Sequence, residues 1–294
     1  FCICQRDGWR RKHDMRLLHF LEYDISEGLI RFWRRYLWLI VLVFITCLLL
    51  DRASGDYLGM YGESWSPLGY MVNEFWGQRP FHFNQNTPDQ FRLPLAWVLQ
   101  YILLAYCIGN YVEEDMHGFG MQLMLKSRSR VLWWSSKCIC CVCINLFYFL
   151  LLYGMTYGYA WISTGNMSIY GQKIALSLYY GEEVADTPMP ELICMAVLLP
   201  VLAGIVQSMI QLLLSLYMNS AAVMSVITFI LVLSAYYGNR FLVHGYAMMC
   251  RYYSDSLYPQ DVVLTTTFGI PYLTCLIAGL AGCGYGIMRK RNII

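Results

Sequence analysis

The sequence predicts an all-α, polytopic membrane protein in which about six transmembrane helices follow an amphipathic interfacial helix. Hydrophobic residues make up 58% of the 294 residues and charged residues only 14%, whereas soluble domains contain about 25% charged residues. The 24 Tyr and 9 Trp suit aromatic belts at two membrane interfaces. A net charge of +2 gives no reason to expect a nucleic-acid partner.

Residues 11–32 are predicted to form the amphipathic helix. Leu17, Leu21, Ile25 and Leu29 recur at four-residue steps and would share one face. The polar residues around them include Arg16, Glu22, Asp24 and Glu27. A helix with one apolar and one charged face lies in the membrane interface and does not cross it.

Six apolar stretches follow, and a helix needs about 20 apolar residues to cross a hydrocarbon core of about 30 Å. The predicted spans are about 34–50, 93–112, 138–162, 192–217, 221–237 and 262–288. The sixth carries Ala278, Gly282 and Gly286 at four-residue steps, a pattern that lets a neighbouring helix approach closely. We expect the whole chain, residues 1–294, to form a single transmembrane domain.

The distribution of Lys and Arg predicts that both termini are cytoplasmic. With this orientation the cytoplasmic segments contain Arg6, Arg10, Arg11, Lys12, Arg16, Arg31, Lys126, Arg128, Arg130, Lys137, Arg289, Lys290 and Arg291. The outside segments, about 51–92, 163–191 and 238–261, contain many carboxylates. The first of them is also rich in aromatic residues. It would form a small cap over the exit, re-enter the outer leaflet, or place these residues in an interfacial belt.

The sequence lacks the residue patterns that several kinds of catalytic, transport or metal site require. The sequence contains no G-x-x-x-x-G-K-[ST] phosphate loop and no H-E-x-x-H motif. No Asp or Glu lies in the apolar core of a span, which argues against a proton-coupled transporter. Cys138, Cys140, Cys141 and Cys143 fall on two helix faces and would not converge on one metal ion. We therefore expect no catalytic, cofactor-binding or metal site on this chain.

Four amide side chains lie inside the predicted spans. Gln207 and Gln211 are one turn apart in the fourth span, Gln100 is in the second and Asn145 in the third. In hydrocarbon each amide needs a hydrogen-bond partner, and contacts between helices are the favoured interpretation. The alternative is that they line a substrate path.

The cytoplasmic segment between the second and third spans is the most unusual polar stretch. It begins with Glu113, Glu114 and Asp115, continues through a basic and apolar run, and reaches Lys137. The residues of interest in it are Gly118, Leu123, Met124, Lys126, Ser127, Arg128 and Arg130. One interpretation is an interfacial elbow whose cations meet lipid phosphates. The other is a docking helix for a cytosolic partner.

This segment, the amphipathic helix and the six spans together resemble an ABC-2-type permease. The similarity is greatest to the small permeases that work with separate ATPases in bacterial peptide and lantibiotic export and in antimicrobial peptide immunity. The resemblance implies that Gly118–Arg130 is a coupling helix that docks on the ATPase. It also implies that the chain hydrolyses nothing itself, because the partner ATPase binds ATP and Mg.

The resemblance further implies a second permease subunit, identical or homologous, and a location in the cell membrane. The expected function is ATP-driven export of a peptide or another amphipathic molecule. A non-transporting membrane scaffold or sensor that docks a cytosolic partner is the alternative. An intramembrane enzyme is a third possibility, but no convergent catalytic set supports it.

Overall fold

A computed structural model of the chain describes residues 24, 33–61, 64–82, 91–117, 130–165, 173–254 and 261–290. Every regular element within these ranges is a helix. Four helical stretches are long and apolar enough to cross a membrane: Trp33–Gly55, Val131–Thr164, Met189–Leu214 and Thr266–Lys290. Two shorter apolar helices cover Leu95–Gly109 and Ser220–Tyr236. This composition is compatible with a membrane-embedded protein.

The long elements coincide with the apolar stretches of the sequence. They are α2 (Trp33–Met60), α4 (Leu95–His117), α6 (Arg130–Thr164), α10 (Leu199–Leu214), α11 (Ser220–Tyr236) and α12 (Thr266–Lys290). The short helix α9 (Met189–Ile193) and the π-helical turn η2 (Cys194–Leu198) lead directly into α10. Helix α2 continues ten residues beyond the predicted end at 50. The prediction stopped there because hydropathy falls at Asp51 and Arg52, but the helix does not end at these residues.

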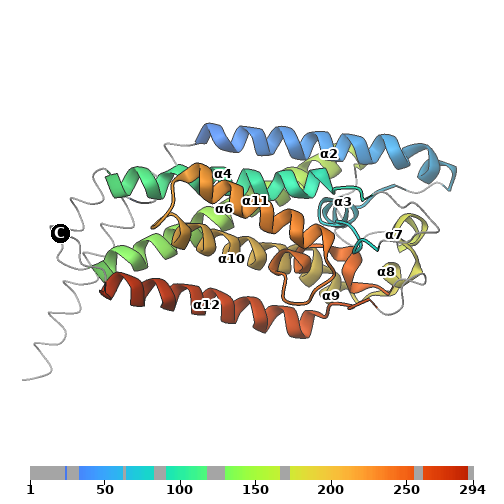
Figure 1. Cartoon of the computed structure of the whole chain (residues 1–294). Coiled ribbons are helices and arrows are strands. Elements are labelled where there is room, and N and C mark those ends of the chain that lie inside the picture. Colours follow the sequence, from blue (N-terminus) through green and yellow to red (C-terminus); the bar gives the residue numbers. More distant parts are fainter. Residues whose placement is uncertain are drawn as a thin grey trace, which may run out of the picture.

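These helices form an elongated bundle (Figure 1). Helix α10 packs against α4, α6 and α12, while α2 packs against α4 and α6. Helices α2, α6 and α11 begin, and α4, α10 and α12 end, at the same end of the bundle, on the left in Figure 1. We call this the terminal end. The link between α10 and α11 is short, and the Asn219 side chain accepts from Ala222 N at 3.0 Å to cap α11.

Short helices gather at the opposite end, which we call the cap end (Figure 1). They are α3 (Pro67–Glu74), α7 (Lys173–Tyr180), α8 (Glu182–Asp186), η3 (Val243–Ala247) and η4 (Met249–Tyr252). Helix α3 starts at a Ser66 N-cap followed by Pro67, both favoured at this position. Met249 N donates to Phe75 O at 2.8 Å and Cys250 N to Trp76 O at 3.0 Å, joining α3 to η4. Part of the predicted first outside segment is thereby packed against η4 at this end of the bundle.

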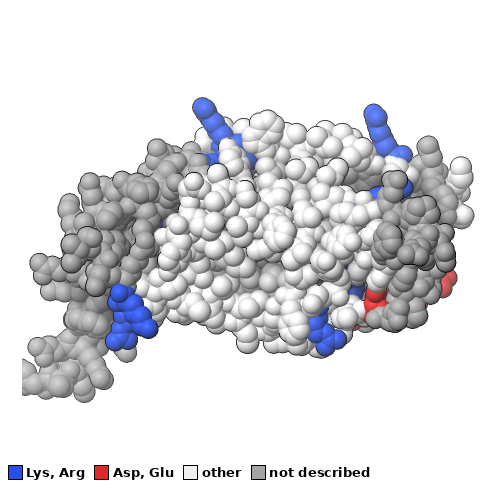
Figure 2. Space-filling model, viewed as in Figure 1, with Lys and Arg blue, Asp and Glu red and all other residues white. Residues whose placement is uncertain are grey.

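Apolar side chains cover the outside of the bundle. On α2, Trp38 is 63% and Leu49 60% exposed, as expected of side chains that face lipid. Figure 2 shows Lys and Arg toward the two ends of the visible face, Asp and Glu at the cap end, and a broad uncharged belt between them.

The close helix packing of α12 is made by a residue outside the predicted stripe. A Cβ atom added to Gly284 would lie 1.9 Å from Trp134 Cζ2, so this glycine lets the indole of α6 lie directly against α12. Within the described chain, Cβ atoms at Gly282 and Gly286 would meet nothing within 4 Å. Within the described residues, the predicted stripe is therefore not the face of α12 that packs against α6.

Candidate functional site

The buried amides connect the central helices. Gln207 Nε2 donates to Tyr101 O at 2.9 Å, and Gln211 Nε2 donates to Ala105 O at 2.8 Å. Both acceptors are backbone carbonyls of α4, and both donors lie on α10. The side chains of Gln207 and Gln211 therefore form hydrogen bonds between helices, as the favoured interpretation predicted.

Asn145 supplies the third connection, from α6 to α10. Its Nδ2 donates to Ser208 Oγ at 3.2 Å. The helices approach closely at Gly204, where an added Cβ would lie 2.8 Å from Asn145 Nδ2. The bundle thus contains a polar layer between α4, α6 and α10.

Several atoms of this layer keep unused hydrogen-bonding capacity. In the described part of the chain, Gln100 Oε1, Asn145 Oδ1, Gln211 Oε1 and His244 Nδ1 are buried and accept no hydrogen bond. Buried polar atoms in folded proteins normally have a partner, which can be water. Each of these four atoms can still accept a hydrogen bond.

His244 of η3 extends the layer toward the cap end. Its Nε2 lies 2.7 Å from Gln207 Oε1. Because Gln207 Nε2 already donates to Tyr101 O, Oε1 is the acceptor and His244 Nε2 carries the hydrogen. Burial lowers the pKa of His244 to about 3, so the imidazole is neutral. The sequence indicated no role for His244. Its only signal was its place in the segment that follows the fifth apolar stretch, and this does not predict a contact with Gln207.

A buried carboxylate enters the interior from α3, which is not a spanning helix. Glu74 is 2% exposed and accepts hydrogen bonds from Thr46 Oγ1 and Gln100 Nε2. Cys47 Sγ lies 3.8 Å from Glu74 Oε1. Burial raises the pKa of Glu74 to about 7, and the hydrogen bonds from Thr46 and Gln100 oppose this rise.

The prediction that no Asp or Glu lies in the apolar core of a span considered only the spans. It therefore missed Glu74, which is buried among the helices but belongs to the segment between the first two spans. A signal was present in the sequence, because Ser66 followed by Pro67 predicts a helix start and the residues after them are mostly apolar. Gln100, predicted as a substrate contact or interhelical donor, donates to this carboxylate.

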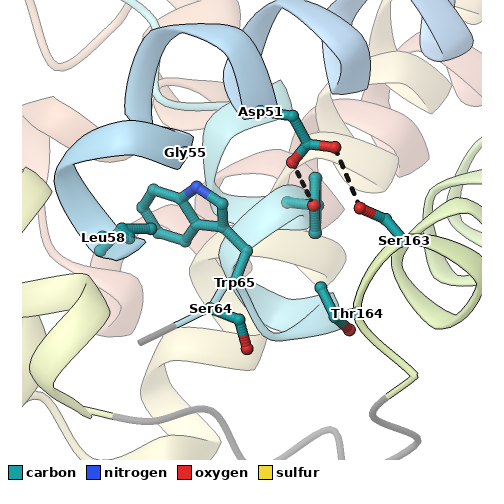
Figure 3. A pocket seen from close by; sticks show the side chains of 8 residues that line it. Asp51, Gly55, Leu58, Ser64, Trp65, Ser163 and Thr164 are labelled. Carbon is teal, nitrogen blue, oxygen red and sulfur yellow. Dashed lines mark hydrogen bonds between the residues drawn. The ribbon is translucent and has the colours of Figure 1, made fainter. Parts of the chain in front are cut away.

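A second carboxylate, Asp51 of α2, lies at a pocket at the cap end (Figure 3). The pocket has a volume of about 430 Å³. Residues of α2, α3 and α6 and the short stretch 64–65 line it. Asp51 accepts hydrogen bonds from Tyr70 Oη, from Tyr159 Oη at 2.6 Å and from Ser163 Oγ at 3.1 Å.

The two carboxylates lie along one interface between α2 and α3. Asp51 of α2 meets Tyr70 of α3, while Cys47 of α2 meets Glu74 of α3. In each helix the paired residues are four positions, or about one turn, apart. A row of polar contacts therefore leads from the pocket at Asp51 to Glu74, and through Gln100 to the central helices.

Near the terminal end, Asp24 and Lys137 form a buried ion pair, with 2.7 Å between Asp24 Oδ1 and Lys137 Nζ. The sequence predicted Asp24 on the polar face of an interfacial helix. Its side chain is instead covered by α6, because the ammonium of Lys137 and the hydroxyl of Ser136 satisfy the carboxylate.

Most residues of the predicted coupling helix lie outside the described residues: Gly118, Leu123, Met124, Lys126, Ser127 and Arg128. Arg130 is the first residue of α6, and its side chain also lies outside the described part. The helices that flank this segment are α4 and α6, which meet it at the terminal end (Figure 1).

Within the described residues, no group of three or more His, Cys, Asp or Glu side chains is arranged to hold a metal ion. Cys140 and Cys141 of the predicted cysteine cluster are buried on α6, while Cys138 and Cys143 are half-buried. They serve as small packing residues of this helix.

No protein-family model matches the sequence, and no curated protein or solved structure is similar to it. The fold and the site define a class only: a helical protein compatible with membrane embedding, with a polar interior and a carboxylate-lined pocket at one end.

Proposed function

We propose that this chain is the transmembrane permease subunit of an ATP-driven transporter of the ABC-2 type. In this proposal it exports a peptide or another amphipathic molecule across the cell membrane. A separate ATPase binds ATP and Mg, and a second permease subunit completes the transport path.

One observation carries the proposal: the two helices that flank the predicted coupling segment also hold the polar interior. Helix α4 carries Gln100, and α6 carries Asn145. Both residues retain a buried, unused acceptor in the described structure. A rigid-body movement of α4 and α6, driven by an ATPase at their terminal end, would therefore change the polar layer itself.

The same proposal includes six spans with both termini in the cytoplasm. Helices α4 and α11 run between the same two ends as the four longer apolar helices (Figure 1). With six crossings, the coupling segment and both chain ends fall on one side of the membrane. The Lys and Arg distribution makes that side cytoplasmic.

The proposal is tested by co-purification with an ATPase chain that carries a phosphate loop and comes from the same genome. Leu123→Asp and the double variant Arg128→Glu/Arg130→Glu should lose the ATPase while still inserting into the membrane. Burial of an aliphatic anchor such as Leu123 contributes about 1.5–3 kcal/mol to docking. Arg240→Glu, an exposed change at the cap end, is the matched control and should retain the ATPase.

Three outcomes would contradict the proposal. If the coupling variants retain the ATPase and its substrate-stimulated hydrolysis, residues 118–130 are not the coupling element. If they fail to insert and the surviving protein is normally coupled, the segment is a lipid-facing elbow. Retention of a partner without any transport by the wild type would indicate the scaffold alternative.

A further inference from the structure

The pocket beside Asp51 has the size and construction of a small-molecule site. Its volume of about 430 Å³ falls within the range of roughly 300–1,000 Å³ typical of ligand pockets. Figure 3 shows Asp51 and Ser163 on one side of the space and Trp65 with Leu58 on another. Four separate parts of the chain thus converge on it.

The charge of Asp51 is held in place by neutral groups. Its three hydrogen bonds come from the hydroxyls of Tyr70, Tyr159 and Ser163. Among the residues that the structure describes, Asp51 forms no ion pair. Tyrosine and serine hydroxyls orient a carboxylate without neutralising it, so its negative charge is available to the pocket.

Two further polar groups of the pocket, on Thr164 and Trp65, use their hydrogens elsewhere. Thr164 Oγ1 donates to Ala160 O at 2.8 Å, and Trp65 Nε1 donates to Ser54 Oγ at 2.6 Å. The hydroxyls of Tyr70 and Ser163 donate to Asp51. These lining groups therefore present acceptor oxygens and aromatic surface to the pocket and have no hydrogen left to donate.

Two further features make the site attractive to a positive charge. Ser163 and Thr164 are the last residues of α6, and a helix C-terminus carries a partial negative charge. The aromatic ring of Trp65 lines the pocket and can interact with a cation through its face. An ammonium group has three donors and no acceptor, which complements this lining.

We propose that this pocket binds the ammonium group of an organic cation, such as a lysine side chain of a peptide, with Asp51 as its counter-ion. The proposal names a ligand class for the proposed transport function. Binding to the pocket requires neither an ATPase nor transport, so its test is independent of the coupling test.

The experiment measures binding of N-acetyl-lysine amide to the full chain in lipid nanodiscs by ligand-observed NMR titration. The wild type should bind this probe but not its Nε-acetylated analogue, which has no ammonium charge. Asp51→Asn should weaken binding by about tenfold or more, because a charge-assisted contact is lost. Asp261→Asn, a carboxylate change outside the pocket, should bind as the wild type does.

A second pair of variants keeps the test decisive if Asp51→Asn folds poorly. Gly55 lines the pocket, and an added Cβ there would meet nothing within 4 Å. Gly55→Leu should therefore fill the space and abolish binding, while Gly59→Leu, one turn further along α2 and equally open, should not. The proposal is overturned if the wild type does not bind the lysine probe or binds both probes equally. Unchanged binding in folded Asp51→Asn or Gly55→Leu would overturn it as well.

Discussion

Lys137 Nζ lies 2.7 Å from Asp24 Oδ1, although the two residues are 113 positions apart in the sequence. The side chains are 1% and 2% exposed, so the ion pair is fully enclosed. Ser136 Oγ donates to the other carboxylate oxygen at 2.5 Å. Asp24 is thereby fixed to α6, seven positions after that helix begins.

Lys137→Met should destabilise the protein by about 3–5 kcal/mol, because it removes the ammonium that lies 2.7 Å from the buried Asp24 carboxylate. The double variant Asp24→Asn/Lys137→Met should recover part of this loss. A double-mutant cycle of unfolding in detergent measures the coupling between the two sites. Lys290→Met, an exposed change, is the control. Additive effects of the two single changes would contradict the ion pair.

Glu74→Gln should remove a pH dependence of stability between about pH 4.5 and pH 7. Burial raises the pKa of Glu74 from 4.5 to about 7, so the folded protein binds more protons than the unfolded chain in this window. The contribution of Glu74 to the stability of the wild type therefore falls as the pH rises from about 4.5 to about 7. In melting experiments, the stability of Glu74→Gln relative to that of the wild type should be higher at pH 8 than at pH 5.

The wild type has to be compared with Glu74→Gln, because His244 changes the stability of both with pH in the opposite direction to Glu74. Burial lowers the pKa of His244 from 6.5 to about 3, so its contribution to stability is lost as pH falls below 6.5. This contribution is common to the wild type and Glu74→Gln and cancels in their difference. A difference that stays constant from pH 5 to pH 8 would show that Glu74 does not titrate in this range.

Arg251→Met should destabilise the cap end. The buried guanidinium donates to Gln78 O at 3.2 Å, Tyr237 O at 2.9 Å and Ala235 O at 3.0 Å. It therefore holds the end of α11 against the segment that follows α3. Loss of these contacts costs on the order of 3 kcal/mol, whereas Arg240→Met, at an exposed position, should cost little. Equal melting temperatures for the two variants would argue against this role.

Gly284→Ala and Gly282→Ala should have opposite effects on α12. An alanine at 284 collides with the Trp134 ring, whose Nε1 is held by a 2.9 Å hydrogen bond to Ala281 O. We expect a loss of about 1–3 kcal/mol. At 282 the added methyl group meets nothing within 4 Å, so the higher helix propensity of alanine should stabilise the protein slightly. Melting temperatures of the two variants, measured side by side, decide this.

The positions of the long helices follow from the sequence, because each is marked by a continuous apolar stretch. The site does not follow in the same way. Tyr159 and Asp51 are 108 positions apart, and Glu74 and Gln100 are 26 apart, so their contacts depend on how the helices pack. Hydropathy also ended the first span at Leu50, just before Asp51, and so gave no sign that Asp51 continues α2 and faces α3.

The measurement that most directly tests the proposed transport function is peptide uptake into sealed inside-out vesicles that contain this chain and its ATPase. A fluorescent, lysine-containing peptide should accumulate only with ATP and Mg, and Arg128→Glu/Arg130→Glu should abolish accumulation while the chain remains in the membrane. Accumulation that is independent of ATP, or equal in the wild type and the double variant, would contradict the account.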